Sequence, residues 1–391
     1  MDKAIPPTNT LMYFFFAFIA MVGTSYINFL PGVVNALAGS IGFSEAEAGQ
    51  IVALNIYGAL SGSIAAVFLI GKVNWKCVLA LFLVLLATFD LSTSWISDYI
   101  IMLVWRFIAG FIGGFCMGIS FSILARLASP DRAFGALLFT QFGICFVVLA
   151  ILPSLEAILD PYAVFYVMGV LSLVSVCILF TLPDQSLKAD APTEIKGRII
   201  NKTGAALLMS ALMLYLCAAN AIWTYVGLIG LNAGIAEQNV NNAIAITSLL
   251  GLIGALLPVL IGKRLGRLFC IISGIVFSII AAFLLSLKPM SIGYYVIAMS
   301  LIFFAWPAVN AYLLATTAEM DPSGKLSSIA ALVSLFGAAS GPMMASGLIG
   351  DGDFTSMLYS CSAIFIVSAI FSIRPTQQQT PDVTFANANQ A

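Results

Sequence analysis

Leu69-Ile70-Gly71-Lys72 recurs, at close to half the chain length further on, as Leu260-Ile261-Gly262-Lys263. Each copy is followed four residues after its lysine by another cation, Lys76 or Arg267. Two looser echoes keep the same order: Pro130 and Arg132 correspond to Pro322 and Lys325, and Phe142-Gly143 corresponds to Phe336-Gly337. Parallel internal repeats are one way in which secondary transporters are built. The repeat therefore predicts a duplicated membrane unit, with two similar helix bundles around a central site.

The composition places this unit in a lipid bilayer. Of the 391 residues, 61% are apolar and only 8% are charged, and the mean hydropathy is +1.07. Soluble domains typically carry about 25% charged residues. The net charge of -1, with no long basic run, excludes the electrostatic footprint of a nucleic-acid-binding protein.

The cysteines and the missing histidines argue against a metal site. The seven cysteines are scattered singly among apolar residues, no CxxC pair occurs, and the chain has no histidine. Zinc, haem and disulfide frameworks need clustered ligands of these types. We expect no metal and no cofactor, and we interpret each cysteine as a small packed hydrophobe.

Twelve apolar stretches are long enough to span a membrane, for which about 20 residues are needed. They begin near Leu11, Ala46, Lys76, Asp98, Ala133, Pro161, Gly204, Asn239, Leu268, Ser291, Leu326 and Phe354. The one long polar connection divides them six and six. The predicted fold is thus an all-α membrane protein with twelve transmembrane helices in two bundles. The parts are an N-terminal bundle (1–183), a cytoplasmic linker (184–203), a C-terminal bundle (204–374) and a disordered cytoplasmic tail (375–391).

The distribution of cations predicts the orientation. Apart from Arg106 inside a span and Lys288, all of the 16 lysines and arginines fall in segments on the same side as the N-terminus. By the positive-inside rule, this side and both termini face the cytoplasm. The chain is expected to be a multi-pass protein of the cytoplasmic membrane and a monomer.

This arrangement resembles the major facilitator superfamily over nearly the whole chain. The best local match is the stretch RFIAGFIGG from Arg106 to Gly114, which follows the family's pattern of an embedded arginine before spaced glycines. Size and pattern are similar to the bacterial drug and sugar efflux branches, but these motifs do not fix a branch. The resemblance implies transport by alternating access of the two bundles.

The same resemblance suggests residues that serve the conformational change. The loop after the second helix keeps the family's glycine and cations without its acid, and the GxxxGP signature of antiporters stands in the eleventh helix instead of the fifth. Spaced glycines in the fourth helix either leave a groove beside Arg106 or permit close helix packing. The candidates are Gly71, Lys72, Gly110, Gly114, Gly262, Lys263 and Pro342.

Arg106 is the candidate for solute recognition. It lies eight residues into the fourth span, about 12 Å deep. A charge at such depth costs at least about 2.5 kcal/mol, so Arg106 is expected to face an aqueous cavity or a partner. No acidic residue is expected at comparable depth. Asp90, Glu156 and Glu319 lie toward the ends of their predicted helices, and we interpret them as residues of the membrane interface. A lone guanidinium favours an anionic or polar solute. The alternative is that Arg106 ties its helix to a neighbour through oxygens.

In the superfamily the first, fourth, seventh and tenth helices line the cavity, and here they carry amides and aromatic rings near mid-span. Such groups suit a polar organic molecule, although buried amides also join helix to helix at about 0.6 kcal/mol each. The candidates are Arg106, Asn28, Tyr26, Gln141, Asn220, Trp223, Tyr225, Trp306 and Asn310. Gln141 belongs to the fifth helix, and Asn55 of the second helix is a further residue that could join them.

The predicted function is secondary active transport of a small anionic or polar organic solute. The alternative is a proton-coupled drug or sugar efflux pump in which Asp90 or Glu156 carries the proton. An enzyme is disfavoured because no span contains a paired-carboxylate, Ser/His or metal-ligand constellation. The expected partners are the solute, protons in the coupled case, and the lipid bilayer.

Overall fold

The computed structural model of the chain describes residues 10–69, 74–127, 129–182, 202–261, 265–321, 325–350 and 352–377. Within these ranges, eleven helices are long and apolar enough to cross a membrane, and two shorter apolar helices precede them. The long helices begin within a few residues of the predicted positions. Together with the divided first span they form the expected twelve-span, two-bundle arrangement.

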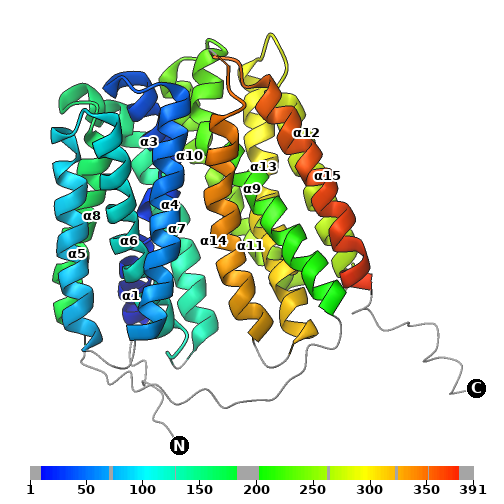
Figure 1. The fold of residues 1–391 in the computed structure, drawn as a ribbon, viewed down its shortest axis with the longest axis horizontal. Coiled ribbons are helices and arrows are strands. Elements are labelled where there is room, and N and C mark those ends of the chain that lie inside the picture. The colour runs from blue at the N-terminus through cyan, green and yellow to red at the C-terminus, as the bar shows by residue number, and fades with distance from the viewer. Residues whose placement is uncertain are drawn as a thin grey trace, which may run out of the picture.

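The two bundles lie side by side (Figure 1). The first consists of α1 (Thr10–Val22), α2 (Ser25–Asn28), α3 (Leu30–Asn35), a π-helix (Ala36–Ile41), α4 (Glu45–Leu69), α5 (Trp75–Leu91), a 3-10 turn (Ser92–Trp95), α6 (Tyr99–Leu124), α7 (Pro130–Ile158) and α8 (Ala163–Thr181). The second consists of α9 (Lys202–Asn232), α10 (Glu237–Ser248), α11 (Leu250–Ile261), α12 (Arg267–Leu285), α13 (Ile292–Met320), α14 (Lys325–Ser346) and α15 (Thr355–Gln377).

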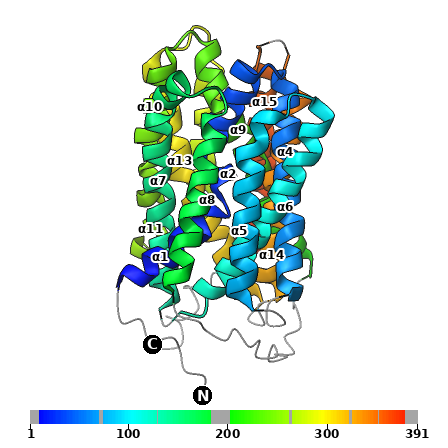
Figure 2. The ribbon, with the colours of Figure 1, turned by 90° about the vertical axis from the view of Figure 1, so that its left-hand side faces the viewer.

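The predicted boundaries between the parts lie mostly outside the described residues. This holds for linker residues 184–201 and for 378–391 of the tail, whereas α9 already begins at Lys202 and α15 continues to Gln377. The start of α1 and the end of α15 lie at the same end of the molecule, here called the terminal end (Figures 1 and 2). The other is called the opposite end.

Side-chain caps fix where several spans begin. Ser44 and Glu47 form a reciprocal pair at the start of α4: the Ser44 N–H donates to Glu47 Oε2 at 2.8 Å, and the Glu47 N–H donates to Ser44 Oγ at 3.2 Å. Asn74 caps α5, and Asp98 accepts from the Ile101 N–H at the start of α6. These caps satisfy backbone donors that a helix N-terminus leaves free.

The first span is the most irregular. It is interrupted at Gly23-Thr24 and again at Phe29, before it ends in a π-helix. Gly23 lies against the backbone of α6, where a Cβ would come within 2.8 Å of the Met117 nitrogen. Pro31 follows the second break and cannot donate a backbone hydrogen bond. The interruption falls at the depth of the central pocket described below.

The cations of the sequence repeat tie neighbouring helices together within each bundle. Lys76 Nζ donates to the Leu182 carbonyl at 2.7 Å, and Arg267 Nη2 donates to Glu319 Oε1 at 2.8 Å, which joins α12 to α13. The other repeat residues singled out in the sequence, Gly71, Lys72, Gly262 and Lys263, lie outside the described residues.

The spaced glycines bring α4 and α6 into backbone contact. A Cβ at Gly110 would collide with the Asn55 carbonyl, and one at Gly114 with the Ala59 carbonyl. Gly58 and Gly62 meet the α6 backbone in the same way, so glycines on both helices permit the close packing. Gly110 and Gly114 therefore permit close helix packing, while Gly110 and Gly113 also border a small cavity that Arg106 does not line.

Arg106 has an acidic partner inside the first bundle. Its Nη1 donates to Asp90 Oδ1 at 3.0 Å, while Nη2 donates to the Phe89 carbonyl at 3.1 Å and to Thr93 Oγ1. The Phe165 ring faces the guanidinium, 4.9 Å from Cζ to its centroid. Arg106 is 0% and Asp90 3% exposed. The expectation of an arginine with no acid at its depth was wrong, as was the interfacial interpretation of Asp90.

We expect Gly110→Ala to separate α4 from α6 and to destabilise the protein by about 1–3 kcal/mol, the usual cost of overpacking. The measurement is the midpoint of thermal unfolding in detergent. Gly143→Ala in α7 is the matched control, because its Cβ would meet nothing within 4 Å. Equal midpoints for the two variants would contradict the packing role.

We expect Asp90→Asn to lower the free energy of unfolding by about 3–5 kcal/mol, because it leaves a buried guanidinium without its counter-charge. In the double variant Asp90→Asn/Arg106→Met, the uncompensated charge is gone and part of this stability returns. Thermal midpoints of the single and double variants check the effect. A double variant no more stable than Asp90→Asn would show that the charge is not the cause.

Candidate functional site

A pocket lies between the two bundles. It holds about 600 Å³ of empty space, a figure that includes the part of the cavity open to its surroundings. Its walls come from the first, fifth, seventh and tenth spans, through α2, α7, α9 and α13. The lining residues are Ile27, Asn28, Gln141, Phe142, Cys145, Ala219, Asn220, Trp223, Ile302, Phe303 and Trp306.

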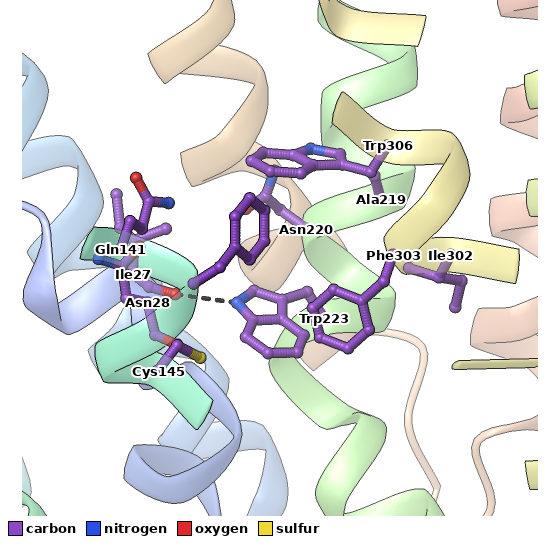
Figure 3. Close-up of a pocket in the computed structure, with 11 residues that line it drawn as sticks. Ile27, Asn28, Gln141, Cys145, Ala219, Asn220, Trp223, Ile302, Phe303 and Trp306 are labelled. Atoms are coloured by element: carbon purple, nitrogen blue, oxygen red, sulfur yellow. Dashed lines mark hydrogen bonds between the residues drawn. The ribbon is translucent and has the colours of Figure 1, made fainter. Parts of the chain in front are cut away.

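Five of the predicted solute-binding residues line this pocket: Asn28, Gln141, Asn220, Trp223 and Trp306. Figure 3 shows Asn28, Gln141 and Cys145 on the side of the first bundle, facing Asn220, Trp223 and Trp306 on the second. The fourth span was expected to line the cavity, and here the fifth takes its place. The reason is that α6 is packed against α4 and α5 and keeps Arg106 inside the bundle.

Much of the hydrogen-bonding capacity of the pocket is unused. Asn28 Nδ2 donates to Thr24 Oγ1 at 3.3 Å and Asn220 Nδ2 donates to the Leu216 carbonyl at 2.9 Å. The amide oxygens of both residues, the Gln141 amide and the Trp306 indole N–H have no hydrogen-bond partner within the described part of the chain. The pocket thus offers free donors and acceptors, and none of the lining residues that the structure describes is charged.

Aromatic rings form the apolar part of the lining. Trp223 and Phe303 meet edge to face, with ring centroids 5.3 Å apart and an interplanar angle of 75°. Such pairs hold each other in place and add about 0.5–1.5 kcal/mol beyond burial. Together with Phe142 and Trp306 they suit a flat, partly apolar solute whose edge carries polar groups.

The other predicted binding residues lie elsewhere. Tyr26 and Asp90 border a second, smaller cavity within the first bundle, which also involves Asn55. The Tyr225 hydroxyl donates to the Glu45 carbonyl at 3.0 Å. Asn310 lies outside the pocket lining, and its buried Oδ1 has no hydrogen-bond partner among the described residues. Arg106 lines neither cavity.

The second coupling candidate, Glu156, lies near the C-terminal end of α7. Its Oε1 is buried and has no hydrogen-bond partner in the described chain. Asp90 and Glu156 thus differ in surroundings, since one carboxylate is paired with an arginine and the other is not.

Several lining residues were missed by the sequence reasoning. Cys145 follows Gln141 by four positions and Phe303 precedes Trp306 by three, so helical periodicity from the predicted residues points to both. For the Ile27 carbonyl, the only sequence signal is Pro31, which lacks the N–H that would pair with it in a regular helix. Whether the helix is regular at this point cannot be predicted from the sequence.

At the opposite end the bundles are joined by a polar seam. Asn232 Nδ2 donates to Glu45 Oε1 at 3.0 Å, next to the Tyr225 contact with the same residue. Near the middle of α4, the Tyr57 hydroxyl lies 3.1 Å from Ser340 Oγ. Gly49 permits this approach, since a Cβ there would collide with the Tyr225 hydroxyl and lie 3.2 Å from the Pro342 carbonyl. The seam holds α4 against α9 and α14.

Comparison with known proteins agrees with this architecture. The chain is similar to the purine ribonucleoside efflux pump NepI of Shigella dysenteriae serotype 1 (strain Sd197), with 27% identity over 248 residues. The aligned part covers 61% of this chain and 62% of that protein, so it spans less than two thirds of the relative.

Solved structures show the same fold at low sequence identity. The nucleoside transporter NupG superimposes with a TM-score of 0.72 at 15% identity, covering 94% of this chain and 98% of that one. A bacterial homologue of the human lysosomal transporter Spinster, in an inward-facing and unoccupied conformation, gives 0.73 at 15% identity, with 96% and 99% covered.

The sequence profile of the Major Facilitator Superfamily matches residues 13–342. This match confirms the resemblance seen in the sequence, and with it the expectation of a transporter and not an enzyme. The chain belongs to the Major Facilitator Superfamily and is a multi-pass membrane transport protein.

Proposed function

We propose that the protein is a secondary active transporter for a polar, uncharged organic solute with a planar ring, of the nucleoside class. The observation that carries this proposal is the pocket between the bundles, in which aromatic rings stand beside unpaired amides and no charged residue takes part in the lining. A planar base would lie against the rings and use the amides at its edge. The names of NepI and NupG point to the same class of solute.

The sequence predicted a solute that is either anionic or polar. The absence of charged residues from the described lining favours an uncharged polar solute. An anion would need a guanidinium or ammonium in reach, and Arg106 is engaged with Asp90, Phe89 and Thr93. For an uncharged solute, the amide oxygens of Asn28 and Asn220 supply acceptors, and Trp306 and Gln141 supply donors. We place the solute against these four residues.

Transport would follow from rocking of the bundles about the pocket. In this proposal, the contacts of Glu45 with Asn232 and Tyr225 close the opposite end, and the solute enters the pocket from the terminal end. With both termini in the cytoplasm, as the cation distribution predicts, this is the state closed to the outside. Breaking the seam would open the other side.

Proton coupling is the second mechanism, in which Asp90 or Glu156 carries the proton. It is favoured by the burial of Asp90 beside a separate cavity and by the unpartnered Oε1 of Glu156. In both mechanisms the solute occupies the central pocket, so they differ in driving force and not in the binding site.

We expect the purified protein in liposomes to take up radiolabelled inosine, and Trp306→Ala to weaken its binding about 5- to 150-fold. This range corresponds to the loss of base stacking on one aromatic side chain, about 1–3 kcal/mol. Uptake is measured with and without a pH gradient, because dependence on the gradient distinguishes the coupled mechanism. Trp95→Ala is the control, since this side chain is 86% exposed outside the pocket. Equal uptake by both variants would rule out the pocket as the site.

We expect Asn232→Asp to weaken the seam by placing a second carboxylate beside Glu45. Exposed charges interact by about 0.2–1 kcal/mol, so the closed population should fall by at most about fivefold. Spin labels at positions Ser97 and Ala236, with the exposed Cys77 and Cys177 replaced by serine, report the separation of the bundles at this end. Asn239→Asp adds the same charge at an exposed position of α10 and is the control. An unchanged distance distribution in Asn232→Asp would mean that the seam does not govern closure.

A further inference from the structure

The break in the first span leaves one backbone carbonyl without its helical donor. In a regular helix the carbonyl of Ile27 would accept from the N–H four residues later. That residue is Pro31, which has no N–H. Within a membrane an unpaired carbonyl is costly, so another donor is required.

The donor comes from the other bundle. Trp223 Nε1, on α9, donates to the Ile27 carbonyl at 2.9 Å (Figure 3). Both residues line the central pocket, and the indole is held in place by Phe303. The neighbouring carbonyl of Asn28 accepts from Cys145 Sγ at 3.3 Å, but that donor belongs to the same bundle. The Trp223 bond is thus a link between bundles inside the pocket.

A purely structural role does not suit this position. The bond crosses the boundary at which the bundles must move relative to each other during alternating access. When they move, the carbonyl and the indole N–H separate, and each is left unpaired in a part-buried site. An unsatisfied polar group in such a site is unfavourable, so a bound solute that replaces both partners is favoured.

We propose that the Ile27 carbonyl and the Trp223 indole N–H are a paired acceptor and donor for the solute, which inserts between them and takes over the bond. The solute class is one with a donor beside an acceptor on a planar ring, such as the N–H and C=O of a cyclic amide. Its N–H donates to the Ile27 carbonyl, and its C=O accepts from Trp223 Nε1. This inference rests on the proposed function, because it assumes that a heterocyclic base occupies the pocket.

The test uses inosine, whose ring carries N1–H beside a C6 carbonyl, and two analogues that each lose one partner. 1-Methylinosine lacks the N–H, and 6-thioinosine replaces the carbonyl oxygen with sulfur, a weak acceptor. Binding is measured as competition with radiolabelled inosine in proteoliposomes. For the wild type we expect each analogue to bind about 3- to 10-fold more weakly than inosine, the usual worth of one neutral hydrogen bond.

Two substitutions remove the protein partners separately. Pro31→Ala restores a backbone N–H that occupies the Ile27 carbonyl, so the preference for inosine over 1-methylinosine should shrink toward one. Trp223→Phe keeps a ring but removes the donor, so the preference for inosine over 6-thioinosine should shrink. A merely structural bond would change overall affinity or stability without moving either preference selectively.

Matched controls exist for both changes. Trp105 Nε1 also donates to a backbone carbonyl, that of Phe89 at 3.0 Å, but within one bundle, and Pro153 lies inside α7 outside the pocket lining. Trp105→Phe and Pro153→Ala should leave both preferences as in the wild type. If Pro31→Ala fails to fold, Trp223→Phe with 6-thioinosine still decides.

The outcomes separate the two proposals. A wild-type protein that neither binds nor transports inosine overturns the proposed nucleoside class, and this inference with it. A wild type that transports inosine, while Trp223→Phe keeps full discrimination against 6-thioinosine, overturns the exchange of the bond and leaves the transport function standing. Selective loss of each preference in its own variant supports the exchange.

Discussion

The structure depends on one constraint: in a bilayer, every backbone polar group and every charge must find its partner within the protein. Continuous helices meet this constraint along most of the chain. Where the chain departs from them, the partner is a specific side chain. The departures in the first span are accordingly the places where side-chain contacts replace helical hydrogen bonds, and they lie beside the pocket.

The same constraint is met in two opposite ways at similar depth. Inside the first bundle, Arg106 is enclosed by Asp90, Thr93, the Phe89 carbonyl and an aromatic face, which is a closed set of contacts with only Nε left over. In the pocket, by contrast, Gln141 and Trp306 keep free hydrogen-bonding groups. Groups that are paired within the protein hold helices together, whereas unpaired donors and acceptors are available to bind a solute. Charge therefore serves the fold, and in the proposed function the neutral polar groups face the solute.

The positions of the spans could be predicted because hydropathy is a local property: the starts near Ala46, Lys76 and Leu326 differ by one residue from those of α4, α5 and α14. The pairing of Arg106 was missed because contacts between helices are not local. A signal was nevertheless present, since Asp90 precedes Asp98 by eight residues and Arg106 follows it by eight. In two antiparallel helices joined near Asp98, equal spacing places both at equal depth. The fifth span lines the pocket instead of the fourth because glycines pack α6 against α4. The spacing of these glycines in the sequence is compatible both with a groove and with close packing, so it did not predict this choice.

The difference in strength between the two kinds of contact explains why one of them suits transport. Breaking a buried ion pair costs about 3–5 kcal/mol, so a state in which the pair is broken is rarely populated. A single neutral hydrogen bond contributes only about 0.5–1.5 kcal/mol net. The link from Trp223 to Ile27 is of the second kind, so a solute that offers one donor and one acceptor matches it closely in energy. The proposed exchange replaces the Trp223–Ile27 bond with bonds to the solute at nearly equal free energy. The solute can then both bind and leave, as a carrier requires.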